Sequence, residues 1–190
     1  EALELVAARW PDTLLLLAPR RPERFGEVAR MVEQAGWPVA RRSALLLDDG
    51  ASAGVLRPES GERRAVLLLD SLGELASLYQ LPDAVFVGGS LVPSGGHNPL
   101  EPAAFGKAPV FGPSMDNFRD IAAEFLRSGA AVQVTSGAEL GAAWIALLEN
   151  DQRRDEMGKQ ARALVERHRG ATAATLDQLA GFLGAPRVLR

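Results

Sequence analysis

The stretch that decides the fold lies at residues 88–113 and reads GGSLVPSGGHNPLEPAAFGKAPVFGP. A strand ends at its first glycine pair, and a loop follows that holds a second pair, Gly95-Gly96. A short helix then begins near Asn98, and residues 109–111 start a new strand. In α/β proteins a glycine-rich strand exit before a helix binds anions, because N–H groups and the helix dipole favour negative charge. The stretch therefore predicts an α/β fold and an anionic ligand near Glu101, one turn into the helix.

Short apolar segments alternate with amphipathic segments along the rest of the chain. Strands are predicted at residues 13–18, 37–41, 44–47, 65–69, 84–87, 109–111 and 131–134. Helices are predicted at residues 1–10, 22–36, 71–80, 98–106, 117–128, 138–150, 151–169 and 171–183, and a polar loop at residues 48–64. This alternation is typical of a parallel sheet with helices on both faces and right-handed crossovers. We expect one Rossmann-like domain over residues 1–190, with buried strands at 13–18 and 65–69.

The composition excludes several classes of protein. Apolar residues make up 47% of the 190 residues and charged residues 24%, as in soluble globular proteins. The 21 basic and 24 acidic residues are mixed, so no nucleic-acid partner is expected. With no cysteine and two histidines, disulfides are excluded and a zinc cluster is disfavoured. No apolar run approaches the ~20 residues that span a bilayer, and the pattern starts in mid-helix, so we expect a soluble fragment of a longer protein.

Four segments follow predicted strands, at the edge where open parallel sheets bind ligands. These segments are residues 19–22, 70–75, 88–101 and 112–117. They supply arginines, glycine backbone, acids and helix N-termini, which suit the phosphate and ribose of a nucleotide. The GxGxxG and Walker patterns, a Ser-His-Asp order and metal-ligand spacings are absent from the sequence, so we expect no cofactor and no metal. The chain offers binding groups more clearly than a catalytic base.

Structural roles remain open for the residues around the second glycine pair. Asn98 and Glu101 have the spacing of a capping box, in which an N-cap side chain and an N3 acid satisfy the first turn. Gly95 and Gly96 fit either a tight turn or an anion-binding nest. His97 is a candidate base or phosphate contact, although a single loop histidine usually has neither role.

The same question arises for the other candidate residues. Arg20 is either a surface charge or, because it follows a predicted strand, a ligand contact. Ser71 and Glu74 also have capping-box spacing. His168 lies in the charged stretch ERHRG, and we expect it at the surface.

Residues 88–93 and 95–104, which read GGSLVP and GGHNPLEPAA, resemble the bacterial 3-deoxy-D-manno-octulosonic acid (Kdo) transferases of lipopolysaccharide synthesis. The segment PRRPERF at 19–25 is similar to that family's PRHPERF, with Arg21 in place of the commoner histidine. DSLGEL at 70–75 is similar to its D-T-x-G-E-L, with serine for threonine. FGP at 111–113, NFR at 117–119 and HRGA at 168–171 also fit, so the resemblance covers essentially the whole chain.

The resemblance implies a GT-B glycosyltransferase, with two Rossmann-like domains facing a cleft, of which this chain is the C-terminal, donor-binding half. The implied donor is CMP-Kdo, and the acceptor is a lipid A precursor, lipid IVA, at the cytoplasmic side of the bacterial inner membrane. Transfer would invert the anomeric centre without a metal. The general base would be a glutamate of the N-terminal acceptor domain, which this chain lacks, so we expect no catalytic residue here and an inactive fragment. An S-T-H-x-G-E-E segment would lie just before Glu1.

The resemblance also assigns roles to individual residues. The expected substrate-binding residues are Arg20, Gly73, Glu74, Leu75, Gly95, Gly96, His97, Asn98 and Glu101. Arg20 and the N–H groups near the second glycine pair would stabilise the departing phosphate, Glu101 would hold the ribose hydroxyls, and residues 73–75 would line the cytidine or sugar pocket. Two alternatives remain: a GT-B transferase with a UDP-sugar donor, and a non-catalytic nucleotide-binding Rossmann domain.

Overall fold

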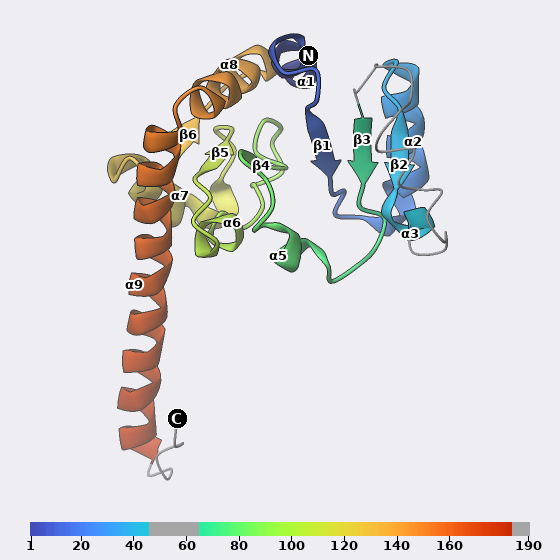
Figure 1. The fold of residues 1–190 in the computed structure, drawn as a ribbon. Coiled ribbons are helices and arrows are strands. Elements are labelled where there is room, and N and C mark those ends of the chain that lie inside the picture. The colour runs from blue at the N-terminus through green and yellow to red at the C-terminus, as the bar shows by residue number, and fades with distance from the viewer. Residues whose placement is uncertain (46–64, 184–190) are drawn as a thin grey trace. The chain divides into compact units, whose positions relative to one another are not determined.

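The structure, a computed structural model, describes residues 1–45 and 65–183 (Figure 1). The predicted loop at 48–64 and the end of the predicted strand at 44–47 lie outside the described residues. The chain divides into two compact units. Unit 1 comprises Glu1–Leu78 and Gly137–Ile145, and unit 2 comprises Tyr79–Ser136 and Ala146–Arg190. The expectation of one domain over residues 1–190 stays a prediction.

Unit 1 is built on a parallel sheet of strand order β1-β3-β2. Its strands are β1 (Leu14–Leu17), β2 (Val39–Arg41) and β3 (Ala65–Leu68). Its helices are α1 (Ala2–Arg9), the 3-10 turn η1 (Pro22–Arg24), α2 (Phe25–Gln34), α3 (Arg42–Leu45), α5 (Leu75–Leu78) and most of α8 (Gly137–Leu148). Val66 of the central strand packs with Ala7 and Trp37 in the core. The central strand therefore provides the apolar face that the sequence predicts for residues 65–69.

Three predictions for unit 1 are wrong in detail. Leu14 of β1, in a strand expected to be buried, is 50% exposed, and within the described residues of unit 1 β1 pairs with β3 alone. The expected strand at 44–47 begins as a helical turn, because the backbone N–H and hydroxyl of Ser43 bind Asp70 and turn the chain after β2. The helix predicted at 71–80 is reduced to Leu75–Leu78.

Unit 2 is built on a second parallel sheet, of strand order β4-β5-β6. Its strands are β4 (Val85–Val87), β5 (Pro109–Phe111) and β6 (Val132–Gln133). Its helices are α6 (Leu100–Ala104), the 3-10 turn η2 (Asp116–Phe118), α7 (Arg119–Arg127) and α9 (Asp151–Leu183). Phe111, Phe125 and Leu164, from β5, α7 and α9, are almost fully buried in one cluster. Strand and helices thus share one core, as expected of an α/β protein.

The ends of two helices in unit 2 differ from the sequence prediction. Asn117 is not the N-cap of α7, because the helix begins at Arg119 after η2. The two helices expected on either side of Gly170 form one continuous helix, α9, because a single glycine costs a helix only about 1 kcal/mol. His168 lies at the surface as expected, with its side chain 41% exposed, and its Nε2 lies 3.0 Å from Oε2 of Glu124 on α7.

Gly158→Ala is expected to destabilise unit 2 by about 1–3 kcal/mol, the usual cost of overpacking. A methyl group there would collide with the carbonyl oxygen of Gly106, where α9 crosses the end of α6. Gly26→Ala in α2 is the matched control, because nothing lies within 4 Å of its added Cβ. Alanine is the better helix former, so the control is expected to stabilise by up to about 1 kcal/mol. Urea denaturation measures both, and stabilisation by Gly158→Ala would show that the two helices do not approach closely.

Candidate functional site

The glycine loop, defined as residues 88–98, leaves β4 and folds back on itself. Gly95 and Gly96 have φ of +78° and +70°, a region that glycine adopts without strain. The N–H of Gly95 donates to Oγ of Ser114 at 3.1 Å, and that of Gly96 to the carbonyl of Gly89 at 3.1 Å. The N–H of His97 donates to the carbonyl of Gly88 at 3.0 Å. These three N–H groups close the loop, so an anion at this place would have to be bound by other groups.

The ring of His97 lies against the backbone of the first glycine pair. A Cβ at Gly88 would be 3.3 Å from Nδ1 of the ring, and a Cβ at Gly89 would be 3.4 Å from Nε2. His97 itself is partly buried. The glycines thus provide the flat surface on which the imidazole packs, and His97 helps to shape the loop.

Asn98 and Glu101 lie at the start of α6, where the sequence predicts a capping box. Oδ1 of Asn98 accepts a hydrogen bond from the N–H of Leu100 at 3.0 Å, so the side chain does satisfy the first turn. The predicted capping box does not form, because α6 begins at Leu100 with Pro99 as its N-cap, and Asn98 lies one residue earlier. Nδ2 of Asn98 lies 3.4 Å from Oε1 of Glu101. Glu101 is exposed. Its carboxylate is therefore accessible to a ligand while Asn98 holds the helix start.

Tyr79 lies near enough to Glu101 to be affected by its charge. Burial and then the negative charge of Glu101 raise the pKa of Tyr79 to about 12. The ring of Tyr79 also lies 6.4 Å, centroid to centroid, from that of Phe105. The charge of Glu101 therefore acts on Tyr79, whose hydroxyl stays neutral at neutral pH.

Ser90 is a structural residue of the loop that sequence reasoning missed. It is fully buried, donates from Oγ to the carbonyl of Val87 at 2.5 Å and accepts from the N–H of Gly112 at 2.8 Å. Its carbonyl accepts from the N–H of Ser114 at 2.9 Å. These bonds tie the end of β4 to the end of β5. The sequence signal was a serine directly after a glycine pair at a strand exit.

A second group of candidate residues lies in unit 1, in the loop that follows β3. We call residues 70–75 the acidic loop. Oε1 of Glu74 accepts from Nη2 of Arg42 at 2.9 Å, and Oε2 accepts from the hydroxyl of Ser71. This bond joins two side chains and is not the predicted capping box, because α5 begins only at Leu75. The carbonyl of Glu74 accepts from the N–H of Ser77 at 3.1 Å and so begins α5.

The first residue of the acidic loop, Asp70, is held equally closely. Oδ1 accepts from the N–H of Ser43 at 2.8 Å, and Oδ2 from its hydroxyl at 2.7 Å. Burial would raise the pKa of Asp70, but the bonds from Ser43 and the charge of Arg41 outweigh it and lower that pKa. Asp70 is therefore an anchored carboxylate. Sequence reasoning missed the roles of Arg42 and Ser43, whose only signal was their place directly after a strand.

The nine expected site residues thus fall into two groups, both at the carboxyl ends of parallel strands. Arg20 is exposed three residues after β1, and residues 73–75 follow β3 in unit 1. Residues 95–98 and Glu101 follow β4 in unit 2. Within each unit, the members of a group thus follow strands of one parallel sheet.

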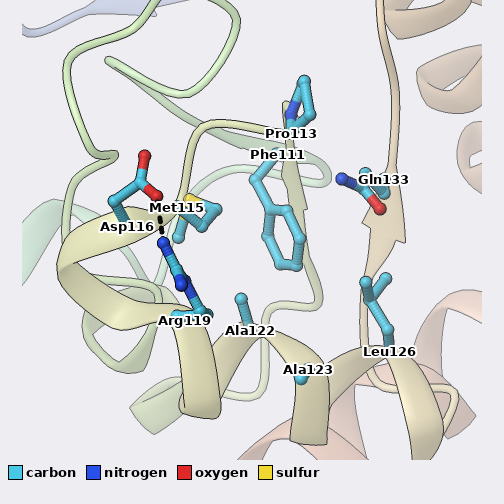
Figure 2. Close-up of a pocket in the computed structure, with 9 residues that line it drawn as sticks. All are labelled: Phe111, Pro113, Met115, Asp116, Arg119, Ala122, Ala123, Leu126 and Gln133. Carbon is cyan, nitrogen blue, oxygen red and sulfur yellow. Dashed lines mark hydrogen bonds and ion pairs between the residues drawn. The ribbon is translucent and has the colours of Figure 1, made fainter.

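A pocket of about 180 Å³ in unit 2 is lined by other residues (Figure 2). Phe111 and Met115 form apolar walls, and Arg119 on α7 pairs with Asp116 at 2.7 Å. None of the nine expected site residues lines this pocket. Within residues 1–45 and 65–183, we find no group of three His, Asp or Glu side chains placed to hold a metal. No described helix is long and apolar enough to cross a membrane.

Comparisons with known proteins relate this geometry to a family. No protein-family model matches the chain. It is 39% identical over 184 residues, 96% of its length, to the 3-deoxy-D-manno-octulosonic acid transferase of Bordetella pertussis. It is 37% identical over 93% of its length to the enzyme of the same name from Haemophilus influenzae. The chain spans only 40% and 39% of the lengths of these two relatives.

A solved structure shows the same fold. It is the C-terminal CMP-Kdo binding domain of WaaA from Acinetobacter baumannii, which matches with a TM-score of 0.68 and 26% identity over 86% of this chain and 95% of that one. The fold is thus that of the Rossmann-like C-terminal domain of a GT-B glycosyltransferase, as the sequence predicts. Within that class, the chain belongs to the Kdo transferase family and corresponds to its C-terminal part.

Proposed function

We propose that this chain is the donor-binding half of a glycosyltransferase that moves Kdo from CMP-Kdo to a lipid A precursor. The observation that carries this proposal is the match of the fold to a CMP-Kdo binding domain. The identity to Kdo transferases along nearly the whole chain supports it. In the complete protein, an N-terminal domain would bind lipid IVA at the cytoplasmic side of the bacterial inner membrane.

The exposed carboxylate of Glu101 is the best group in unit 2 for a ribose. A carboxylate accepts hydrogen bonds from both hydroxyls of a diol, and charged acceptors form the stronger bonds. Asn98, Gly95, Gly96 and His97 hold the loop and the helix start that present Glu101. We assign ribose recognition to Glu101 and the shaping of its loop to the other four residues.

The candidate residues of unit 1 also suit parts of a nucleotide sugar. Arg20 is an exposed guanidinium at a strand end and would bind the phosphate of CMP. Gly73 and Leu75 would line the cytidine or sugar pocket, with Glu74 between them. In the reaction, a carboxylate of the N-terminal domain would deprotonate the acceptor hydroxyl, which attacks the anomeric carbon of Kdo as CMP leaves. Arg20 would stabilise the charge that develops on the leaving phosphate, without a metal and with inversion.

Calorimetric titration of the chain with CMP, UMP, UDP and ADP tests the proposal. Binding of CMP in preference to the other three nucleotides is the expected result. Preference for UDP would retain the fold and replace the donor by a UDP-sugar. Absence of nucleotide binding by the folded chain would contradict a self-sufficient donor site. Kdo transfer by the chain alone would contradict the placement of the general base in the N-terminal domain.

A further inference from the structure

Two residues of α3 hold both ends of the acidic loop. Ser43 binds Asp70, the first residue of the loop, through its N–H and its hydroxyl at 2.8 and 2.7 Å. Arg42 binds Glu74 through Nη2 at 2.9 Å. These contacts join residues that are 27 and 32 positions apart in the chain. The end of β2 is therefore fastened to the loop that leaves the central strand β3.

The tip of the loop is exposed between these two attachments. Leu72 is 73% exposed, and Gly73 is exposed as well. The side chains of Arg42 and Glu74 are only 24% and 33% exposed. Because Leu72 and Gly73 are exposed within the part of the chain that the structure describes, the shape of the tip depends on the contacts at Asp70 and Glu74.

The hydrogen bonds that Glu74 makes within the protein limit its ability to bind a ligand directly. Oε1 is taken by Arg42 and Oε2 by the hydroxyl of Ser71. A carboxylate whose two oxygens each accept a bond from the protein is held in one orientation and has fewer lone pairs left for ribose hydroxyls. Glu74 would therefore act on a ligand by fixing the backbone of residues 72–75.

We propose that Arg42 and Ser43 are positioning residues of the donor site, which fix the acidic loop through Glu74 and Asp70 and so present its tip to the nucleotide. This inference rests on the proposed donor-binding function. The tip lies at the carboxyl end of a central parallel strand, where ligands of such sheets bind. Arg42 need not touch the ligand, because its effect reaches the tip through Glu74.

A double-mutant cycle between Arg42 and Glu74 tests the inference. Arg42→Gln and Glu74→Gln are each expected to weaken CMP binding about tenfold. This loss lies within the usual range of interaction energies between residues in contact. The double variant is expected to bind CMP no more weakly than either single variant, because both changes break the same contact. Arg42→Lys keeps the charge and is expected to restore part of the affinity. Arg30→Gln removes an equal charge from the exposed face of α2 and is the matched control, with unchanged affinity.

Amide hydrogen exchange of residues 72–75, measured by NMR without ligand, gives an independent result. Faster exchange in Arg42→Gln and in Ser43→Ala, with Arg30→Gln unchanged, supports the positioning role. Unchanged exchange and CMP affinity in Arg42→Gln, even with a lowered melting temperature, would overturn it. Additive losses in the double variant would also overturn it, since Arg42 would then act separately from Glu74. If the unaltered chain binds no CMP, the donor proposal fails, while the exchange rates still decide whether Arg42 and Ser43 order the loop.

Discussion

Gly112→Ala is expected to destabilise unit 2 by about 3 kcal/mol or more, at the upper end of the cost of overpacking. Gly112 is buried directly after β5, and its N–H donates to Oγ of Ser90 at 2.8 Å. An added Cβ would overlap the carbonyl group of Ser90 and the N–H of Leu91. These are backbone atoms, which cannot rotate away as a side chain can. The two strand exits would therefore have to separate, and the bonds of Ser90 to both of them would break.

Urea denaturation followed by circular dichroism measures this loss, and Ser90→Ala is the companion variant. It removes the hydroxyl but adds no atoms, and it leaves the N–H of Gly112 and the carbonyl of Val87 without their partner. Its expected cost is about 1–3 kcal/mol, the penalty for a buried polar group left unsatisfied. A Gly112→Ala variant as stable as the unaltered chain would show that the ends of β4 and β5 are further apart than described.

The sequence predicted the strands of unit 2 closely because their signal is local. Residues 84–87 and 109–111 are short apolar runs next to glycine or proline, and β4 and β5 lie within one residue of those ranges. Parallel strands buried on both faces give such runs. The strand predicted at 44–47 was wrong because the turn at Ser43 depends on Asp70, which is 27 residues away. Periodicity within a short window does not contain that information.

In the candidate site, too, features that depend on neighbouring residues were predicted better than contacts between residues far apart in the sequence. The glycine loop was predicted from its own residues. Both capping-box spacings do place the two side chains in contact, but neither pair forms a capping box, because α5 begins at Leu75 and the N-cap of α6 is Pro99. The contact of Arg42 with Glu74 was not predicted, because it depends on the order of the strands, which places β2 beside β3. Likewise, the acceptors of the loop N–H groups are visible only in the folded chain. Family resemblance therefore located the loops, and the structure shows what holds them.

Glu101→Ala is expected to weaken CMP binding by about 1–3 kcal/mol, the range for hydrogen bonds to a charged group. This corresponds to a loss of affinity of roughly 5-fold to 150-fold. The Glu101 carboxylate is exposed, and its hydrogen bond with Asn98 is long, at 3.4 Å. The substitution would therefore remove mainly the hydrogen bonds between this carboxylate and the ribose. Calorimetric titration with CMP measures the change. Asp120→Ala, which removes another exposed carboxylate from the first turn of a helix, is the control and is expected to leave the affinity unchanged.

The sole tyrosine shows whether the Glu101→Ala variant keeps its local fold. Tyr79 lies close enough to Glu101 for that charge to raise its pKa, and its ring packs near that of Phe105. Retained NMR shift dispersion of the Tyr79 ring, together with weakened CMP binding, would assign the loss to the missing carboxylate. Unchanged CMP affinity in a folded Glu101→Ala variant would restrict Glu101 to its contact with Asn98. Ribose recognition would then have to come from groups other than Glu101.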